Sequence, residues 1–305
     1  MTTFRVRPAT ASDLPAVYAV WLRNDAPHET PQLPALNGVL SSFVHEWEHG
    51  EMRVAETDAG QVIGFGGSVS WSGPRGSLTY LADLFIAPDT QSHGVGQAIL
   101  GALPLSAGGR CVHASTDPRA AALYIRTGML PLWPNLWLVA DMQRHPPQRL
   151  DALPGADVEM TAAAADDTQL AAWDVRAFGY LRSRDLAWHV ATRDALPLWF
   201  RRRGATIGYG YIQRHCDESL SRPGAWTIGP IGGETPEDAR DCVCAAVRWA
   251  AERAPVVRLG VPAPHPALAP LIEAGCRIVY NETFLASPEA ALPDVTRYLP
   301  SGVFM

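Results

Sequence analysis

Residues 81–100 combine a strand end, a short loop and a helix start, and their residue types suit the binding of a phosphate group. An apolar run ends at Ile86, and the pattern Gln91-x-x-Gly94-x-Gly96 opens the helix that follows. Glycines at these two positions let the backbone approach a ligand without a Cβ in the way. Successive N–H groups and the positive helix end then face an anion, so the pattern predicts a pyrophosphate site.

Composition excludes several other classes of function. The chain has 305 residues, a formal net charge of −6 and no run of Lys or Arg, so we expect no nucleic-acid partner. No apolar stretch approaches the roughly 20 residues that cross a bilayer, and residues 1–13 show no secretion signal, which predicts a cytoplasmic protein without membrane contact. Five cysteines without a CxxC pair predict reduced thiols and no metal.

The elements that must position this loop follow from hydrophobic periodicity. We expect strands at 3–7, 52–56, 61–71, 79–86, 112–115 and 136–141, and helices after Thr10 and at 40–47, 94–103 and 120–127. Prolines and a glycine crowd into residues 144–155. The mixed α/β order therefore predicts a first domain at 1–143, a linker at 144–156 and a second domain at 157–305.

The second domain repeats the first. The segment 60–66 recurs at 204–210 with an offset of 144 residues, and 125–129 recurs at 272–276 with an offset of 147. Such self-similarity indicates a duplicated unit. Two unrelated α/β domains that share glycine hairpins remain the alternative.

Two motifs in the first domain resemble those of the GNAT superfamily of N-acetyltransferases. Leu84-Phe85-Ile86, Pro88 and the glycine loop match its strand-loop-helix signature, and residues 117–129 match its second motif. The second match departs from the usual pattern in two places. Asp117 stands where an Asn usually contacts the pantetheine arm, and Met129 stands where an aromatic residue usually packs.

The resemblance implies two tandem GNAT-like domains of the α/β class (α+β mixed sheet), each with a central, mostly antiparallel sheet flanked by helices. It also implies an acetyl-CoA site in the first domain and direct transfer of acetyl to an amine. The residues that it assigns to acetyl-CoA are Leu84, Phe85, Ile86, Gln91, Ser92, His93, Gly94, Val95, Gly96, Gln97 and Asp117.

Proton transfer needs further residues. By the same resemblance Tyr124 is the general acid for the leaving thiolate, and a backbone N–H near Ile86 holds the oxyanion. Asp83 is our first candidate for the base, because it lies on the strand face of Phe85. Three rivals remain for that role: Tyr80, Asp25 and Glu29.

The string His45-Glu46-Trp47-Glu48-His49 satisfies the HExxH zinc pattern, but helical phase argues against a metal site. Apolar residues of 40–47 share one helix face, which predicts that His45 and His49 lie on the opposite, solvated face. No third ligand is evident in the sequence, and a zinc site needs three. We therefore expect a chance match.

The second domain lacks the features that carry chemistry in the first. The repeat places Leu271 opposite Tyr124, and the helix start at 234–238 is acidic instead of glycine-rich, which would repel a pyrophosphate. We expect a degenerate domain that is structural or shapes the substrate pocket.

The function predicted is that of an N-acetyltransferase acting on a small-molecule amine, as a monomer or homodimer. The negative charge and the acids Asp25 and Glu29 favour a cationic amine. Two alternatives remain open: a non-catalytic acyl-CoA-binding regulator, which would not need Tyr124, and an acetyltransferase for protein or peptide amines.

Overall fold

The computed structural model describes residues 3–29, 38–105, 108–219 and 222–305, with only the helical backbone for 25–29. The elements of the first half are β1 (Phe4–Pro8), α1 (Leu14–Glu29), α2 (Ser41–His49), β2 (Glu51–Thr57), β3 (Val62–Gly73), β4 (Gly76–Ile86), α3 (Val95–Ala102), β5 (Gly109–Ala114), α4 (Pro118–Arg126) and β6 (Leu130–Asp141). The expected strands and helices of this half are confirmed, with ends that differ by a few residues.

The second half repeats the same order of elements. They are β7 (Glu159–Ala162), α5 (Thr168–Phe178), α6 (Ser183–Thr192), β8 (Ala195–Arg202), β9 (Ala205–Gln213), β10 (Trp226–Gly233), α7 (Pro236–Ala251), β11 (Val256–Pro262), α8 (Leu268–Ala274) and β12 (Arg277–Ala286), followed by β13 (Tyr298–Leu299). The register also repeats. Gly66 pairs with Leu84 in the first half and Gly210 with Ile231 in the second, at the offsets seen in the sequence.

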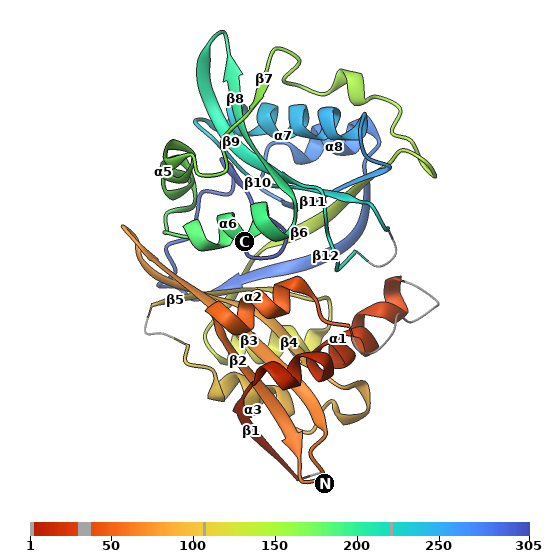
Figure 1. Ribbon diagram of the computed structural model, residues 1–305, viewed down its shortest axis with the longest axis vertical. Helices are drawn as coiled ribbons and strands as arrows, with labels where there is room; N and C mark the ends of the chain where they lie inside the picture. The colour runs from red at the N-terminus through yellow and green to blue at the C-terminus, as the bar shows by residue number, and fades with distance from the viewer. Residues whose placement is uncertain (1–2, 30–37, 106–107, 220–221) are drawn as a thin grey trace.

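The described strands form one 13-stranded mixed sheet in the order β1-β2-β3-β4-β5-β12-β6-β11-β10-β9-β8-β7, with β13 beside β10. Parallel pairing occurs between β4 and β5 and between β10 and β11. The two halves exchange their last strands: β12 pairs with β5, and β6 pairs with β11 (Figure 1). The sequence boundary at 144–156, which holds a short 3-10 turn at Leu150–Ala152, is therefore crossed in space by both exchanged strands.

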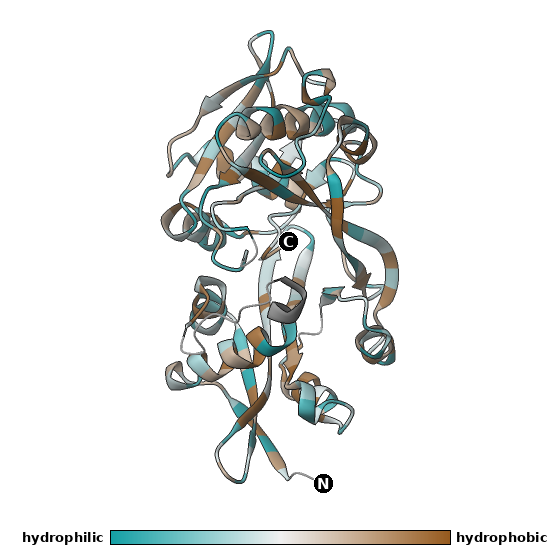
Figure 2. Cartoon of the chain, turned by 90° about the vertical axis from the view of Figure 1, so that its right-hand side faces the viewer, coloured by the Kyte–Doolittle hydropathy of each residue, from teal (hydrophilic) through white to brown (hydrophobic). Residues whose placement is uncertain are grey.

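Helices cover both faces of the sheet in each half. Successive strand residues point to opposite sides, so neighbouring residues of one strand pack against different helices. Val54 packs with α1 and α2 in one cluster, whereas its neighbour Ala55 packs with Val95 and Ile99 of α3 in another. In the second half the sheet packs α7 and α8 on one face and α5 and α6 on the other. Figure 2 shows brown, hydrophobic stretches along strands in both halves.

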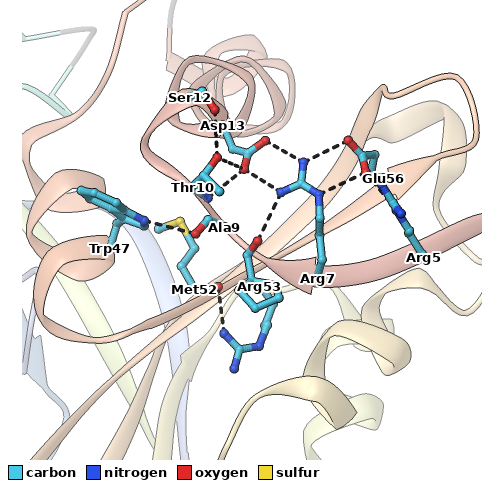
Figure 3. A network of polar contacts seen from close by, with 11 residues as sticks. Arg5, Arg7, Ala9, Thr10, Ser12, Asp13, Trp47, Met52, Arg53 and Glu56 are labelled. Carbon is cyan, nitrogen blue, oxygen red and sulfur yellow. Dashed lines mark hydrogen bonds and ion pairs between the residues drawn. The ribbon is translucent and has the colours of Figure 1, made fainter.

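The start of α1 is tied to the first sheet by a charged network (Figure 3). Arg7 on β1 reaches Asp13 at 2.7 Å and Glu56 on β2 at 3.0 Å. The hydrogen bonds from Arg7 lower the pKa of both carboxyl groups to about 2. Thr10 completes a capping box with Asp13. The network fixes the direction of α1, and Asn24, further along this helix, lines the cleft described below.

None of the helices in the described ranges combines the length and the apolar character that crossing a bilayer would require. All five cysteines are free thiols.

Candidate active site

A cleft of about 1730 Å³ opens where β4 and β5 diverge. The two strands pair only from Leu78 to Leu81, so none of the described strands pairs with residues 82–86 of β4 on that side. The first half supplies β4, the loop after it and α4. The opposite wall comes from the exchanged strand β6 and from the second half, through residues such as Glu218, Arg258, Tyr280, Glu282 and Phe304.

The loop Gln91–Gly96 lies at one end of this cleft with its backbone turned toward it. Ser92 and Gly94 adopt positive φ angles of 65° and 81°. Gly94 is the N-cap of α3, and no atom lies within 4 Å of the place where its Cβ would stand. Gly96 also lines the cleft, and a Cβ added to it would stand 3.6 Å from the side chain of Leu123. Open space beside a helix whose N-cap residue has the left-handed backbone conformation fits the predicted anion site.

The side chain of Gln91 anchors the loop. Its Nε2 donates to Asn24 Oδ1 (3.1 Å) and to the carbonyl oxygen of Ile86 (3.2 Å), while its Oε1 accepts from Arg119 Nη2 (2.9 Å). Asn24 also donates to Ile86 (3.1 Å). The loop is therefore fastened to α1, β4 and α4 together. Neither Asn24 nor Arg119 was identified from the sequence, because no local motif marks either residue.

Asp117 caps α4 at the mouth of the cleft. Its carboxylate accepts from the backbone N–H of Arg119 (2.8 Å) and pairs with the Arg119 guanidinium (2.6 Å). These hydrogen bonds lower the pKa of Asp117. Arg119 also contacts Ser92 Oγ at 3.3 Å, so a cation stands beside the loop.

Tyr124 and Asp83 both line the same cleft. Tyr124 lies on α4 and is buried, and burial, followed by the charge of Asp83, raises its pKa. The phenol is therefore protonated at neutral pH. Asp83 lies at a bulge of β4, where Gly67 and Ser68 of β3 face Asp83 and Leu81.

A second carboxyl group, that of Glu46, lies behind Asp83. Glu46 comes from α2 and is fully buried, and it occupies the space that a Cβ on Gly67 would fill. Burial raises the pKa of Asp83 to about 6, and burial together with the charge of Asp83 raises that of Glu46 well above its usual range. Two carboxylates this close cannot both ionise. Because the pKa of Glu46 is raised further than that of Asp83, Glu46 is the member of the pair that keeps its proton.

The structure corrects the expectation for α2. The prediction that His45 lies on a solvated face is wrong. His45 is buried, its Nε2 lies 2.8 Å from Asp185 on α6, and its ring stacks on Trp188. Helical phase failed because α2 packs against the sheet on one side and against the second half on the other. His49 is exposed as expected. In the described part of the chain no cluster of three His, Cys, Asp or Glu side chains is arranged to hold a metal.

The other predicted residues have separate outcomes. The cleft is lined by Leu84, Phe85, Ile86, Gln91, Ser92, Gly94, Val95, Gly96, Gln97 and Asp117. His93 is exposed beside it, with its Nδ1 2.8 Å from the carbonyl oxygen of Gln91. Tyr80 also lines the cleft, and its hydroxyl lies 3.2 Å from Nδ1 of His113. The side chains of Asp25 and Glu29 lie outside the described residues.

The equivalent place in the second half is filled. β10 carries the matching irregularity between Ile228 and Ile231, but β13 pairs with it there, with Leu299 opposite Ile231. The helix start that corresponds to the glycine loop has Thr235 as N-cap and carries acidic residues in its first turn. Leu271, opposite Tyr124, is buried in the core.

Residues 48–128 match the family model of the acetyltransferase (GNAT) domain. This segment is a GNAT domain. The matched segment includes β4, the glycine loop and Tyr124, so the GNAT motifs and the cleft coincide.

Solved structures share the fold of both halves. A Pyrococcus horikoshii protein assigned as an acetyltransferase has 16% identity and a TM-score of 0.72, covering 99% of this chain and 96% of its own. A GCN5-related N-acetyltransferase from Sphaerobacter thermophilus has 13% identity and a TM-score of 0.63, with 96% and 98% covered. A tandem GNAT protein from the clavulanic acid biosynthesis pathway has 13% identity and a TM-score of 0.60, with 93% and 98% covered. No curated protein matches the sequence.

Proposed function

We propose that the chain is an acetyl-CoA-dependent N-acetyltransferase that transfers acetyl to the amine of a small molecule. One observation carries this proposal. The glycine loop, the ionisable Asp83 and the protonated Tyr124 open onto the same cleft, although they come from three different elements. A regulator that only binds an acyl-CoA would have no use for an acid and a base in the same cleft.

The residues at the loop fit the pyrophosphate of acetyl-CoA. Gly94 leaves open space at a helix start, a Cβ on Gly96 would come no nearer than 3.6 Å to Leu123, and Arg119 adds a cation at the mouth. The backbone N–H groups of the loop would hold the phosphates, and the unpaired edge of β4 at 82–86 would hold the pantetheine arm. When bound, acetyl-CoA supplies an activated thioester carbonyl.

Asp83 is the base that takes the proton of the incoming ammonium group. With a pKa of about 6 it is ionised at neutral pH, and the hydrogen bond from Glu46 lowers the pKa below the value that burial alone would produce. Glu46 does not line the cleft, so it acts through Asp83 as a positioning residue.

Tyr124 donates its proton to the leaving sulfur. The negative charge of Asp83 is one of the two causes that raise the pKa of Tyr124. When Asp83 accepts the amine proton, that charge disappears and the phenol becomes a stronger acid. Deprotonating the amine therefore prepares Tyr124 for the step that needs its proton.

The test is a CoA-release assay with acetyl-CoA and a panel of small primary amines, followed by mass spectrometry of the products. We expect release that depends on one class of amine and an N-acetyl product. Binding of acetyl-CoA without amine-dependent release would support the regulator instead. Turnover of peptides in preference to small amines would show that the acceptor is a peptide or protein amine.

A further inference from the structure

The indole ring of Trp137 forms a flat part of the cleft wall, which we call the shelf. Trp137 of β6 donates its Nε1–H to Glu282 Oε2 on β12 at 3.0 Å, and Asn135 donates to the same oxygen at 3.1 Å. The ring lies against two glycines, since a Cβ on Gly302 would stand 2.7 Å and one on Gly260 3.6 Å from its atoms. The two exchanged strands thus hold the indole in one orientation.

Arg258 of β11 lies on this shelf. Its guanidinium carbon is 4.5 Å from the centroid of the Trp137 ring, and the side chain lines the cleft. Arg258 is half-buried, whereas the fully buried arginines have their own carboxylates: Arg182 has Asp174, and Arg193 has Glu218. Within the residues that the structure describes, Arg258 makes no hydrogen bond and no ion pair. Its guanidinium lines the cleft and is therefore available to pair with an anionic group of a ligand.

The charges that face Arg258 limit what this ligand carries. Glu282 and Glu218 both act on Arg258 through space, but Glu218 is engaged by Arg193, and Glu282 accepts from Trp137 and Asn135. A singly charged planar group meets less repulsion from these two carboxyl groups than a phosphate would. A guanidinium fork matches a carboxylate in two parallel hydrogen bonds.

The shelf is close to the amine end of the cleft. Tyr80 lies between the two: it lines the cleft together with Asp83, and it lines a small adjoining cavity together with Trp137 and Glu282. A small molecule can therefore reach both ends at once.

We propose that the acceptor of this enzyme is an amino acid or a similar small amine that bears a carboxylate, and that Arg258, on its Trp137 shelf, binds that carboxylate while the amine lies at Asp83. The proposal rests on the acetyltransferase function proposed above and adds a substrate class to it. It gives the second half a direct part in acceptor choice, through β11 and the wall around it.

The experiment uses paired acceptors, each an amine with a free carboxylate and its carboxamide counterpart, with kcat/KM measured for the full chain. We expect the carboxylate member to be favoured by at least about tenfold, the range of one charged hydrogen-bonded pair. Arg258→Gln should reduce this preference to near unity, mainly by raising KM for the carboxylate. Arg258→Lys should retain part of it.

The matched control is Arg253→Gln. Arg253 also stacks on a tryptophan, Trp249, at 4.2 Å, but it lies at the exposed end of α7 and not in the cleft. This variant should keep the full preference. Equal turnover of both members by the unaltered enzyme, or an unchanged preference in Arg258→Gln, would overturn the acceptor assignment alone. If neither member of any pair is acetylated although acetyl-CoA binds, the proposed function itself fails. The preference of the unaltered enzyme is informative even if the Arg258 variants fold poorly.

Discussion

The two halves of the chain have the same order of elements and the same strand register, yet in the described residues the edge of β4 borders the cleft while the matching edge of β10 is covered. In the first half, β4 leaves β5 after Leu81, and its edge at 82–86 stays free. In the second half, β13 lies along the matching edge of β10. A Cβ on Gly229 would strike the carbonyl of Pro300, so the filling segment lies directly on the bulge. One fold thus holds either a ligand or a piece of its own chain at the same place.

This difference teaches that loss of a site can be structural as well as chemical. The acidic helix start of α7 removes the attraction for a pyrophosphate. The pairing of β13 also removes the space and the free backbone groups. What the second half keeps is its contribution to the wall of the other cleft.

The largest effect should come from closing the open cleft. Gly96→Glu places a side chain and a negative charge in the pyrophosphate space, so acetyl-CoA binding should fall below detection in titration calorimetry. The unaltered chain should bind one acetyl-CoA. Gly101→Glu is the control and should bind normally, because Gly101 lies at the far end of α3 with open space around its Cβ position. Two equivalent sites per chain would break the comparison between the halves.

The next effect concerns Tyr124, whose counterpart in the second half is a leucine. Tyr124→Phe keeps the ring and removes only the proton, so turnover should fall by about 10² to 10⁴ while acetyl-CoA affinity stays near normal. Steady-state kinetics and calorimetry together check this. Tyr211→Phe, a buried change in the second half, should have little effect on turnover. A loss of less than about threefold in Tyr124→Phe, with chemistry rate-limiting, would remove this residue from the mechanism.

The smallest effect should be a shift in the pH profile. Activity needs ionised Asp83, so kcat/KM should rise as the pH passes through about 6. Glu46→Gln still donates a hydrogen bond to Asp83 and should leave this limb in place. Glu46→Leu removes the donor, and the limb should move to higher pH. An identical limb in both variants would show that Glu46 does not act on Asp83.

Stability should follow the same ionisation. The folded pKa of Asp83, about 6, lies above the usual value of 3.8, so the folded state binds this proton more tightly. The contribution of this proton binding to the free energy of unfolding is fully present below about pH 4 and is lost as the pH rises through about 6. Urea unfolding across this range should show the decline in the unaltered chain and a weaker one in Asp83→Asn.

Local chemistry explains what the sequence could predict. The glycine loop, the helix containing Tyr124 and the repeat depend on neighbours within a few residues, and periodicity reports such neighbours well. Glu46 and Asp83 are far apart along the chain. They meet only because Gly67 has no side chain, which no spacing rule reveals. The burial of His45 likewise depends on the docking of α6.

Pairing between distant strands was beyond prediction for a related reason. β6 has the same sequence pattern whether it pairs with β5 or with β11, because an antiparallel partner leaves no mark on it. Arg258 and Trp137 belong to different halves, so they come together only through this pairing.

The exchange of β6 and β12 also constrains how the protein is made. β5 cannot acquire its neighbour until residues 277–286 have left the ribosome, so the first half must wait, with an unpaired sheet edge, while the second is translated. Domains usually fold one after another during synthesis. Here we expect a single late, slow folding event governed by contacts between residues far apart in sequence. Expression of residues 1–143 alone should leave that edge open to aggregation.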